Sequence, residues 1–226
     1  MIINTSKSAV LHFGKQSPCE SYHVGADTVT LVNSFRELGV LVDNELTFSC
    51  HVNRITLSSF RLINLLFLCF KSTNASFFCS MYATYVLPIL DYCSPLYCPR
   101  TVCQADRIER VQRYFTRKLF RRVFSKVSLV SYSERLKLFN LPTLSVRRVR
   151  SDLQLIYKLS HGLINVPSID IQFSKLNQNR VILSRNRTCI ASSFFTNRAS
   201  KHWNHFLSKR SSADIPKFIR TLSSID

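Results

Sequence analysis

The chain has 226 residues, a net charge of +18 and a hydrophobic content of 46%. This hydrophobic content excludes a disordered chain, and the four glycines and seven prolines favour helices over a loop-rich all-β protein. A positive charge of this size indicates a polyanionic partner, either nucleic acid or an anionic membrane surface.

A small β element is predicted at the N-terminus, where short apolar runs alternate with turn residues. Residues 9–13 and 29–32 fit short strands, and residues 38–42 fit the strongest strand because they are almost wholly apolar. An apolar strand of this kind is usually covered on both faces. Asp43 and Asn44 are expected to form the turn after it.

Helices are predicted from Ser49 onward, because apolar residues there recur every three or four positions. Ser49 is expected to cap the first helix. A second apolar helix is expected over residues 76–90, stopped by Pro88 and the turn-rich residues that follow. The expected fold is therefore mainly α with a small N-terminal β element, an α+β arrangement with a helical bundle.

Further helices are expected in the C-terminal half. Ser131 and Glu134 have the spacing of a capping box ahead of a short helix. A long helix is predicted over residues 143–161, followed by Gly162 as a left-handed C-terminal residue. Two shorter helices are expected to close the chain, over residues 194–207 and 215–222.

The densest charge lies in residues 105–123, ADRIERVQRYFTRKLFRRV. Ile108, Val111, Phe115 and Leu119 recur at the period of one helix face, which predicts an amphipathic helix with one buried stripe and a basic remainder. Arginine favours phosphate because its planar guanidinium presents a fork of donors. Nucleic-acid binding is therefore predicted for basic residues of this block and of the long helix after it: Arg107, Arg110, Arg113, Arg117, Lys118, Arg121, Arg122, Arg147, Arg148 and Arg150.

One stretch has nearly the length of a membrane span. Residues 72–90 carry no charge, but they include several Ser, Thr and Asn side chains and contain Pro88. We therefore expect a buried core helix there and no membrane contact.

The eight cysteines are expected to be free thiols. The first seven residues lack the basic start and apolar run of a signal peptide, which indicates an intracellular protein, nuclear or cytoplasmic and not secreted. Cys69 and Cys79 have large apolar neighbours and are expected in the core.

Candidates for catalysis or metal binding are weak. Asp43 and Glu45 form the closest carboxylate pair, and a solvated turn explains them better than a metal site does. The chain has no glycine-rich phosphate loop and no G-x-S-x-G motif. A zinc site also has little support. Its four candidate ligands would be Cys98, Cys103, His202 and His205, and their spacing along the chain is not typical of zinc sites. We expect no metal, no cofactor and no small-molecule substrate.

Six sequence phrases, taken in their order along the chain, together resemble the C-terminal part of the reverse transcriptase of LINE-type (non-LTR) retrotransposons. The resemblance covers nearly the whole chain and is carried by the phrases Ile3 to Gly14, Phe35 to Val52, Tyr85 to Pro99, Arg107 to Leu119, Glu134 to Gly162 and Phe194 to Phe206.

The resemblance implies a fragment of an RNA-directed DNA polymerase. In that family the catalytic aspartates lie upstream of the phrase that contains Lys7, so the chain is expected to be inactive as a polymerase by itself and to hold no metal. Lys7 matches a lysine of the polymerase palm, and Leu38 and Gly39 match the primer-grip region. Residues 1–48 would then be a palm edge, residues 49–130 a helical thumb and residues 131–226 a C-terminal extension.

The resemblance also names the polyanion as RNA, an RNA–DNA hybrid or DNA, bound through phosphate contacts and shape with little base reading. Two alternatives stay open at this point. The first is a stand-alone basic helical module that binds RNA or DNA. The second is a small membrane-associated basic protein.

Overall fold

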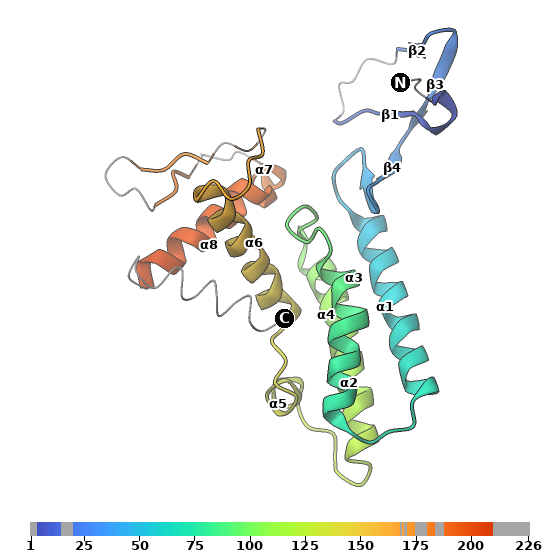
Figure 1. The fold of residues 1–226 in the computed structure, drawn as a ribbon, viewed down its shortest axis with the longest axis vertical. Coiled ribbons are helices and arrows are strands. Elements are labelled where there is room, and N and C mark those ends of the chain that lie inside the picture. The colour runs from blue at the N-terminus through green and yellow to red at the C-terminus, as the bar shows by residue number, and fades with distance from the viewer. Residues whose placement is uncertain are drawn as a thin grey trace. The chain divides into compact units, whose positions relative to one another are not determined.

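The computed structural model describes residues 4–14, 20–167, 169, 171–174, 180–183 and 188–209. The chain forms two compact units, with the boundary between Ile55 and Thr56. Strands lie in the first unit and helices dominate the second (Figure 1). The predicted fold class, mainly α with a small N-terminal β element, is confirmed.

The first unit contains two small sheets. After a short 3-10 turn, η1 (Thr5–Lys7), strand β1 (Ala9–Leu11) pairs in parallel with β3 (Asp27–Val32). Strand β2 (Tyr22–Val24) pairs antiparallel on the other side of β3, which gives the order β1-β3-β2. The predicted strands at residues 9–13 and 29–32 correspond to β1 and β3.

The second sheet is the hairpin of β4 (Ser34–Glu37) and β5 (Val40–Asp43). Leu38 and Gly39 form its two-residue turn, with φ angles of 44° and 89°. Positive φ at both positions is the pattern of a type I′ turn, which matches the twist of a hairpin. The prediction of one strand over residues 38–42, covered on both faces, is therefore wrong at its start, and the Leu38 side chain is 81% exposed.

Asp43 joins the hairpin to α1 (Ser49–Cys69). Its carboxylate accepts hydrogen bonds from the backbone N–H groups of Thr47 and Phe48, both at 2.7 Å. Ser49, expected as the cap, is the first residue of the helix, and its N–H donates to the Thr47 hydroxyl at 3.3 Å. The chain therefore turns into α1 around the Asp43 side chain.

The second unit is built on an aromatic core between α1, α2 (Ala75–Met81) and α4 (Val102–Val123), which lie side by side (Figure 1). Phe67 stacks on Phe78 with ring centroids 4.5 Å apart. Tyr82 stacks on Phe115 at 4.0 Å. The predicted buried stripe of α4 is confirmed, because all four of its members are 0% exposed: Ile108, Val111, Phe115 and Leu119.

Pro88 does not stop the helical stretch, contrary to the prediction. α2 continues through a π-helical turn, η2 (Tyr82–Val86), into α3 (Leu87–Asp91), and Pro88 lies in the first turn of α3. Proline is tolerated in a first turn because its missing N–H needs no helical partner there. The π turn ends the regular α-helical hydrogen-bond pattern just before Pro88, which has no N–H to donate.

The C-terminal helices follow the predicted caps closely. α5 (Tyr132–Leu138) begins with the complete capping box of Ser131 and Glu134. α6 (Leu144–Ser160) is capped by Thr143 and is followed by Gly162 at a φ of 65°. α7 (Cys189–Ser193) precedes α8 (Phe195–Lys209). The helix expected over residues 215–222 lies outside the described residues.

A second buried cluster packs α6 against α8. Its members are apolar side chains from both helices and from the bridge that pairs Phe173 with Val181. The buried residues of this cluster are Leu153, Ile156, Val181, Ala199 and Trp203.

By length and composition alone, α1 is apolar enough to cross a membrane. Residues 72–90, the stretch considered as a span from the sequence, are divided between α2, η2 and α3. Six cysteines of the described residues are free thiols: Cys50, Cys69, Cys79, Cys93, Cys98 and Cys103. Cys69 is exposed at the end of α1, so its expected core position is wrong, whereas Cys79 is half-buried.

Candidate nucleic-acid interface

The outer face of α4 carries most of the predicted binding residues. The helix presents its apolar stripe to the aromatic core, so side chains at the opposite positions point away from that core. Arg110, Arg117 and Arg121 are exposed on this side, and Arg107 and Arg113 are half-buried beside them. We call these five residues the α4 basic face.

Asp106 neutralises part of the α4 basic face. Its carboxylate accepts a hydrogen bond from Arg110 Nε at 2.9 Å and another from Arg113 Nη1. These bonds, the one from Arg113 foremost, lower the pKa of Asp106 below its ordinary value. One carboxylate thus binds two guanidinium groups, and the three side chains together keep a net positive charge.

Arg117 and Arg121 are the least engaged members of the α4 basic face. Neither donates a hydrogen bond to any residue within the described ranges, and both are exposed. Their donors are therefore available to an anionic ligand.

Lys118 and Arg122 point back toward the bundle. Arg122 donates to the carbonyls of Phe67 at 3.0 Å and Phe70 at 3.1 Å, which lie at the C-terminal end of α1. Lys118 donates to Asn64 Oδ1 at 2.7 Å, and its ammonium lies 5.3 Å from the Phe67 ring centroid. Both cations stabilise the contact between α4 and α1, since terminal helix carbonyls and aromatic faces attract positive charge.

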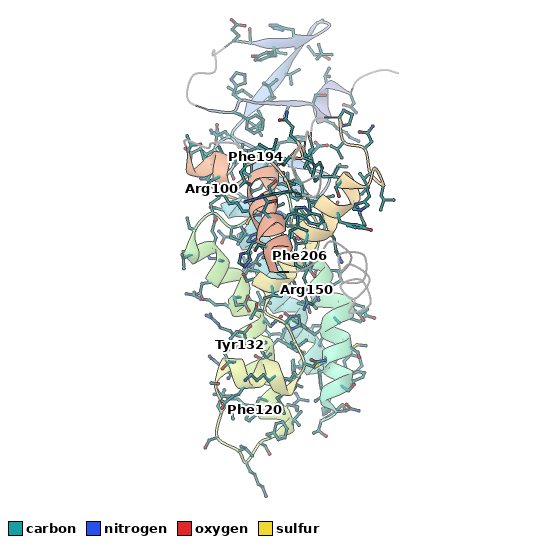
Figure 2. The ribbon with its side chains drawn as sticks, turned by 90° about the vertical axis from the view of Figure 1, so that its left-hand side faces the viewer. Arg100, Phe120, Tyr132, Arg150, Phe194 and Phe206 are labelled. Carbon is teal, nitrogen blue, oxygen red and sulfur yellow. The ribbon has the colours of Figure 1, made fainter. Side chains whose placement is uncertain are left out.

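The predicted residues of α6 are also divided in role. Arg147 forms an ion pair with Asp91 through Nε at 2.9 Å and Nη2 at 2.7 Å, and its side chain is 16% exposed. Arg148 and Arg150 are half-buried, and Figure 2 labels Arg150 on α6. Arg148 shares a cavity of about 320 Å³ with Arg113, Tyr132 and Glu109.

The inner side of α4 contains polar residues that connect it to α5 and to the start of α6. Glu109 Oε1 accepts hydrogen bonds from the Tyr132 hydroxyl and from the Leu144 N–H. Gln112 donates to the Pro142 carbonyl at 2.7 Å and accepts from the Tyr82 hydroxyl at 3.3 Å. Burial, followed by the Glu109 carboxylate, raises the pKa of Tyr132 and keeps its hydroxyl protonated.

Arg135 is a cation next to the α4 basic face that the sequence did not single out. It lies on α5, is 4% exposed, and donates to the Thr116 hydroxyl at 3.3 Å and to the Val130 carbonyl. Two guanidinium groups lie over the Tyr132 ring, that of Arg113 at 5.3 Å and that of Arg135 at 5.7 Å from its centroid. Figure 2 shows Tyr132 on α5, the helix that packs against α4. The local signal in this segment was a capping box, and a cap carries no information on burial.

The remaining predicted residues belong to the first unit. Lys7 ends η1 and is exposed, and Leu38 and Gly39 form the hairpin turn. Within the described part of the chain, no three His, Cys, Asp or Glu side chains come together as a metal site would require.

Comparison with known proteins gives one relative to report. An uncharacterized protein of Caenorhabditis elegans is 26% identical over 141 residues, which span 62% of this chain and 70% of the relative. No protein-family model matches the chain, and no solved structure matches it.

Proposed function

We propose that this chain binds RNA, an RNA–DNA hybrid or DNA through the α4 basic face. The observation that carries the proposal is the positive sign of that face. It has five arginines, and the carboxylate that pairs with two of them is that of the half-buried Asp106. Solvated helix faces usually mix charges of both signs, whereas a phosphate backbone favours a surface of this kind.

The resemblance to the reverse transcriptase of LINE-type retrotransposons supports nucleic acid as the polyanion. The proposal takes two points from this resemblance: the ligand is a nucleic acid, and the chain corresponds to the C-terminal part of an RNA-directed DNA polymerase. Binding would occur through phosphate contacts and duplex shape, because arginines spaced along one helix face can follow a phosphate backbone without reading base edges.

The test is binding of a labelled RNA–DNA hybrid across a range of salt concentrations. The variant Arg117→Gln with Arg121→Gln removes the two least engaged cations of the face. For the wild type, log K should fall linearly with log salt, with a slope proportional to the number of phosphates neutralised. The slope is about −0.9 for each phosphate on B-form DNA. The double variant should bind more weakly and have a slope shallower by about one to two.

A matched control removes the same charge elsewhere in the second unit. Arg61→Gln with Lys71→Gln takes two exposed cations from α1 and the residues after it. If this control lowers affinity as much as the α4 variant does, binding follows net charge and the proposed interface is wrong. Failure of the wild type to bind any of the three nucleic acids would reject the function itself.

A further inference from the structure

Arg135 is a buried cation whose hydrogen-bond acceptors, among the described residues, are neutral groups. Its Nε and Nη1 donate to the Thr116 hydroxyl and the Val130 carbonyl, and Nη2 donates to no residue within the described ranges. No carboxylate pairs with it in this part of the chain. Nη2 is not among the fully buried, unpartnered side-chain atoms of the described residues, so a ligand can reach it. A guanidinium that has an unbonded donor and no counter-ion favours an anion from outside.

Two carboxylates of this region bind groups other than Arg135. Glu109 binds Tyr132 and the Leu144 N–H, and Glu134 is occupied in the capping box with Ser131. Burial first, and then the charge of Arg117, lower the pKa of Arg135 below its ordinary value. Arg135 donates to the hydroxyl of Thr116, the residue that precedes Arg117 on α4, so both arginines lie at the junction of α4 and α5.

The two arginines have complementary properties. Arg135 is fixed in position by Thr116, Val130 and the Tyr132 ring, so it loses little conformational freedom when it binds a ligand. Arg117 is exposed and free to close over a ligand from the outer side. A fixed guanidinium beside a mobile one suits a tetrahedral oxyanion, because each can donate to different oxygens.

We propose that Arg117 and Arg135 together form a binding subsite for one phosphate group. As a subsite for a backbone phosphate, this inference rests on the proposed function. Inorganic phosphate presents the same chemistry and serves as the second probe.

The first experiment is a double-mutant cycle on the full chain with the labelled RNA–DNA hybrid. Arg117→Gln removes one donor, and Arg135→Lys keeps the charge but removes the fork. If both side chains bind the same phosphate, each single variant should lose about tenfold in affinity, and the double variant should lose little more than either. The matched control is the same cycle with Arg117→Gln and Arg121→Gln, in which the two losses of binding free energy should add.

The second experiment measures thermal unfolding in inorganic phosphate against sodium chloride of equal ionic strength. Phosphate should raise the midpoint of the wild type, because a ligand that binds only the folded state stabilises it. The shift should be lost in Arg117→Gln and kept in Arg121→Gln. Arg117→Gln alters an exposed side chain, so this comparison holds even if Arg135→Lys does not fold.

The outcomes separate the two proposals. Additive effects of Arg117 and Arg135, together with equal phosphate shifts in both single glutamine variants, overturn the subsite while nucleic-acid binding by the wild type still stands. Phosphate stabilisation that depends on Arg117, in a protein that binds no nucleic acid, supports the subsite and rejects the proposed function.

Discussion

Arg198 and Asp152 form a two-bonded ion pair that joins α8 to α6. Nε of Arg198 lies 2.8 Å from Oδ2 of Asp152, and Nη2 lies 2.9 Å from Oδ1. The two side chains are 12% and 4% exposed. Arg198 also donates to the carbonyls of Ser193 and Pro95, so one guanidinium connects the C-terminal helices to the segment after α3.

Replacing Arg198 should therefore cost much more than replacing a surface arginine. Arg198→Met leaves the Asp152 carboxylate buried without a partner, which should lower the free energy of unfolding by about 3–5 kcal/mol. Adding Asp152→Leu should restore part of the loss, because no buried charge then remains. Urea denaturation followed by circular dichroism measures both changes. Asp106→Asn, which breaks an ion pair at the surface, is the control and should cost far less, because water screens such pairs. An equal cost would contradict the role given to Arg198.

Acid should destabilise the first unit through His51. Its Nδ1 accepts a hydrogen bond from the Leu41 N–H at 3.3 Å, which requires a neutral ring. Burial, and then the charge of Arg54, lower the pKa of His51 from 6.5 to about 4. The unfolded chain thus binds the proton more readily, and stability present above pH 6.5 is lost as the pH falls toward 4.

The loss should approach about 3 kcal/mol at the acid end of this window. Hydrogen exchange of the Leu41 amide between pH 7 and 4.5 reports the loss locally, after correction for intrinsic rates. His51→Gln keeps an acceptor without titrating, and its stability should be flatter over the same range. The exposed His205→Gln should behave like the wild type. Equal pH dependence in all three proteins would exclude His51 as the cause.

The hairpin turn should be improved by asparagine. Leu38 has a φ of 44°, a left-handed conformation that a leucine adopts at a cost and that asparagine tolerates well. Leu38→Asn would create the Asn-Gly pair favoured in type I′ turns and should raise the free energy of unfolding by about 0.5–1 kcal/mol. Thermal unfolding detects this change. Leu31→Asn alters an exposed leucine within β3 and should have the opposite sign, because asparagine is disfavoured in strands.

Arg122 and Arg121 should differ although they are neighbours in the basic block. Arg122→Gln removes the donors to the carbonyls at the end of α1 and the cation over the Phe67 ring, 5.5 Å from its centroid. It should lower the free energy of unfolding by about 1–3 kcal/mol. Arg121→Gln should leave stability unchanged and should weaken nucleic-acid binding. If Arg121→Gln lowered stability and Arg122→Gln did not, the roles assigned to these two residues would be wrong.

Local signals in the sequence predicted the helices of the second unit well. The stripe from Ile108 to Leu119 follows the helical period, and a period reports directly which face is buried. The Ser131–Glu134 box and the Thr143–Gly162 helix were predictable because caps act within a few residues. Such features depend on the chain near them, so they can be read without knowing the tertiary fold.

The errors arose where distant or competing preferences decide the structure. Leu38 belongs to an apolar run, but the pairing of β4 with β5 places it in a turn. Pro88 is a strong helix breaker, yet the π turn before it lets the helical path continue. The position of Arg135 depends on how α5 packs against α4, and no period in a seven-residue helix indicates that packing.

The polar inner side of α4 has a mechanical consequence for its outer side. Glu109, Gln112 and Thr116 bind groups from α5 and from the residues around the start of α6, about one helical turn apart. Rotating α4 by one residue about its axis would break all three sets of hydrogen bonds, even if the apolar contacts could adjust. These bonds therefore set the direction in which the arginines of the outer face point, and buried side chains that meet no ligand define the geometry that a phosphate backbone would encounter.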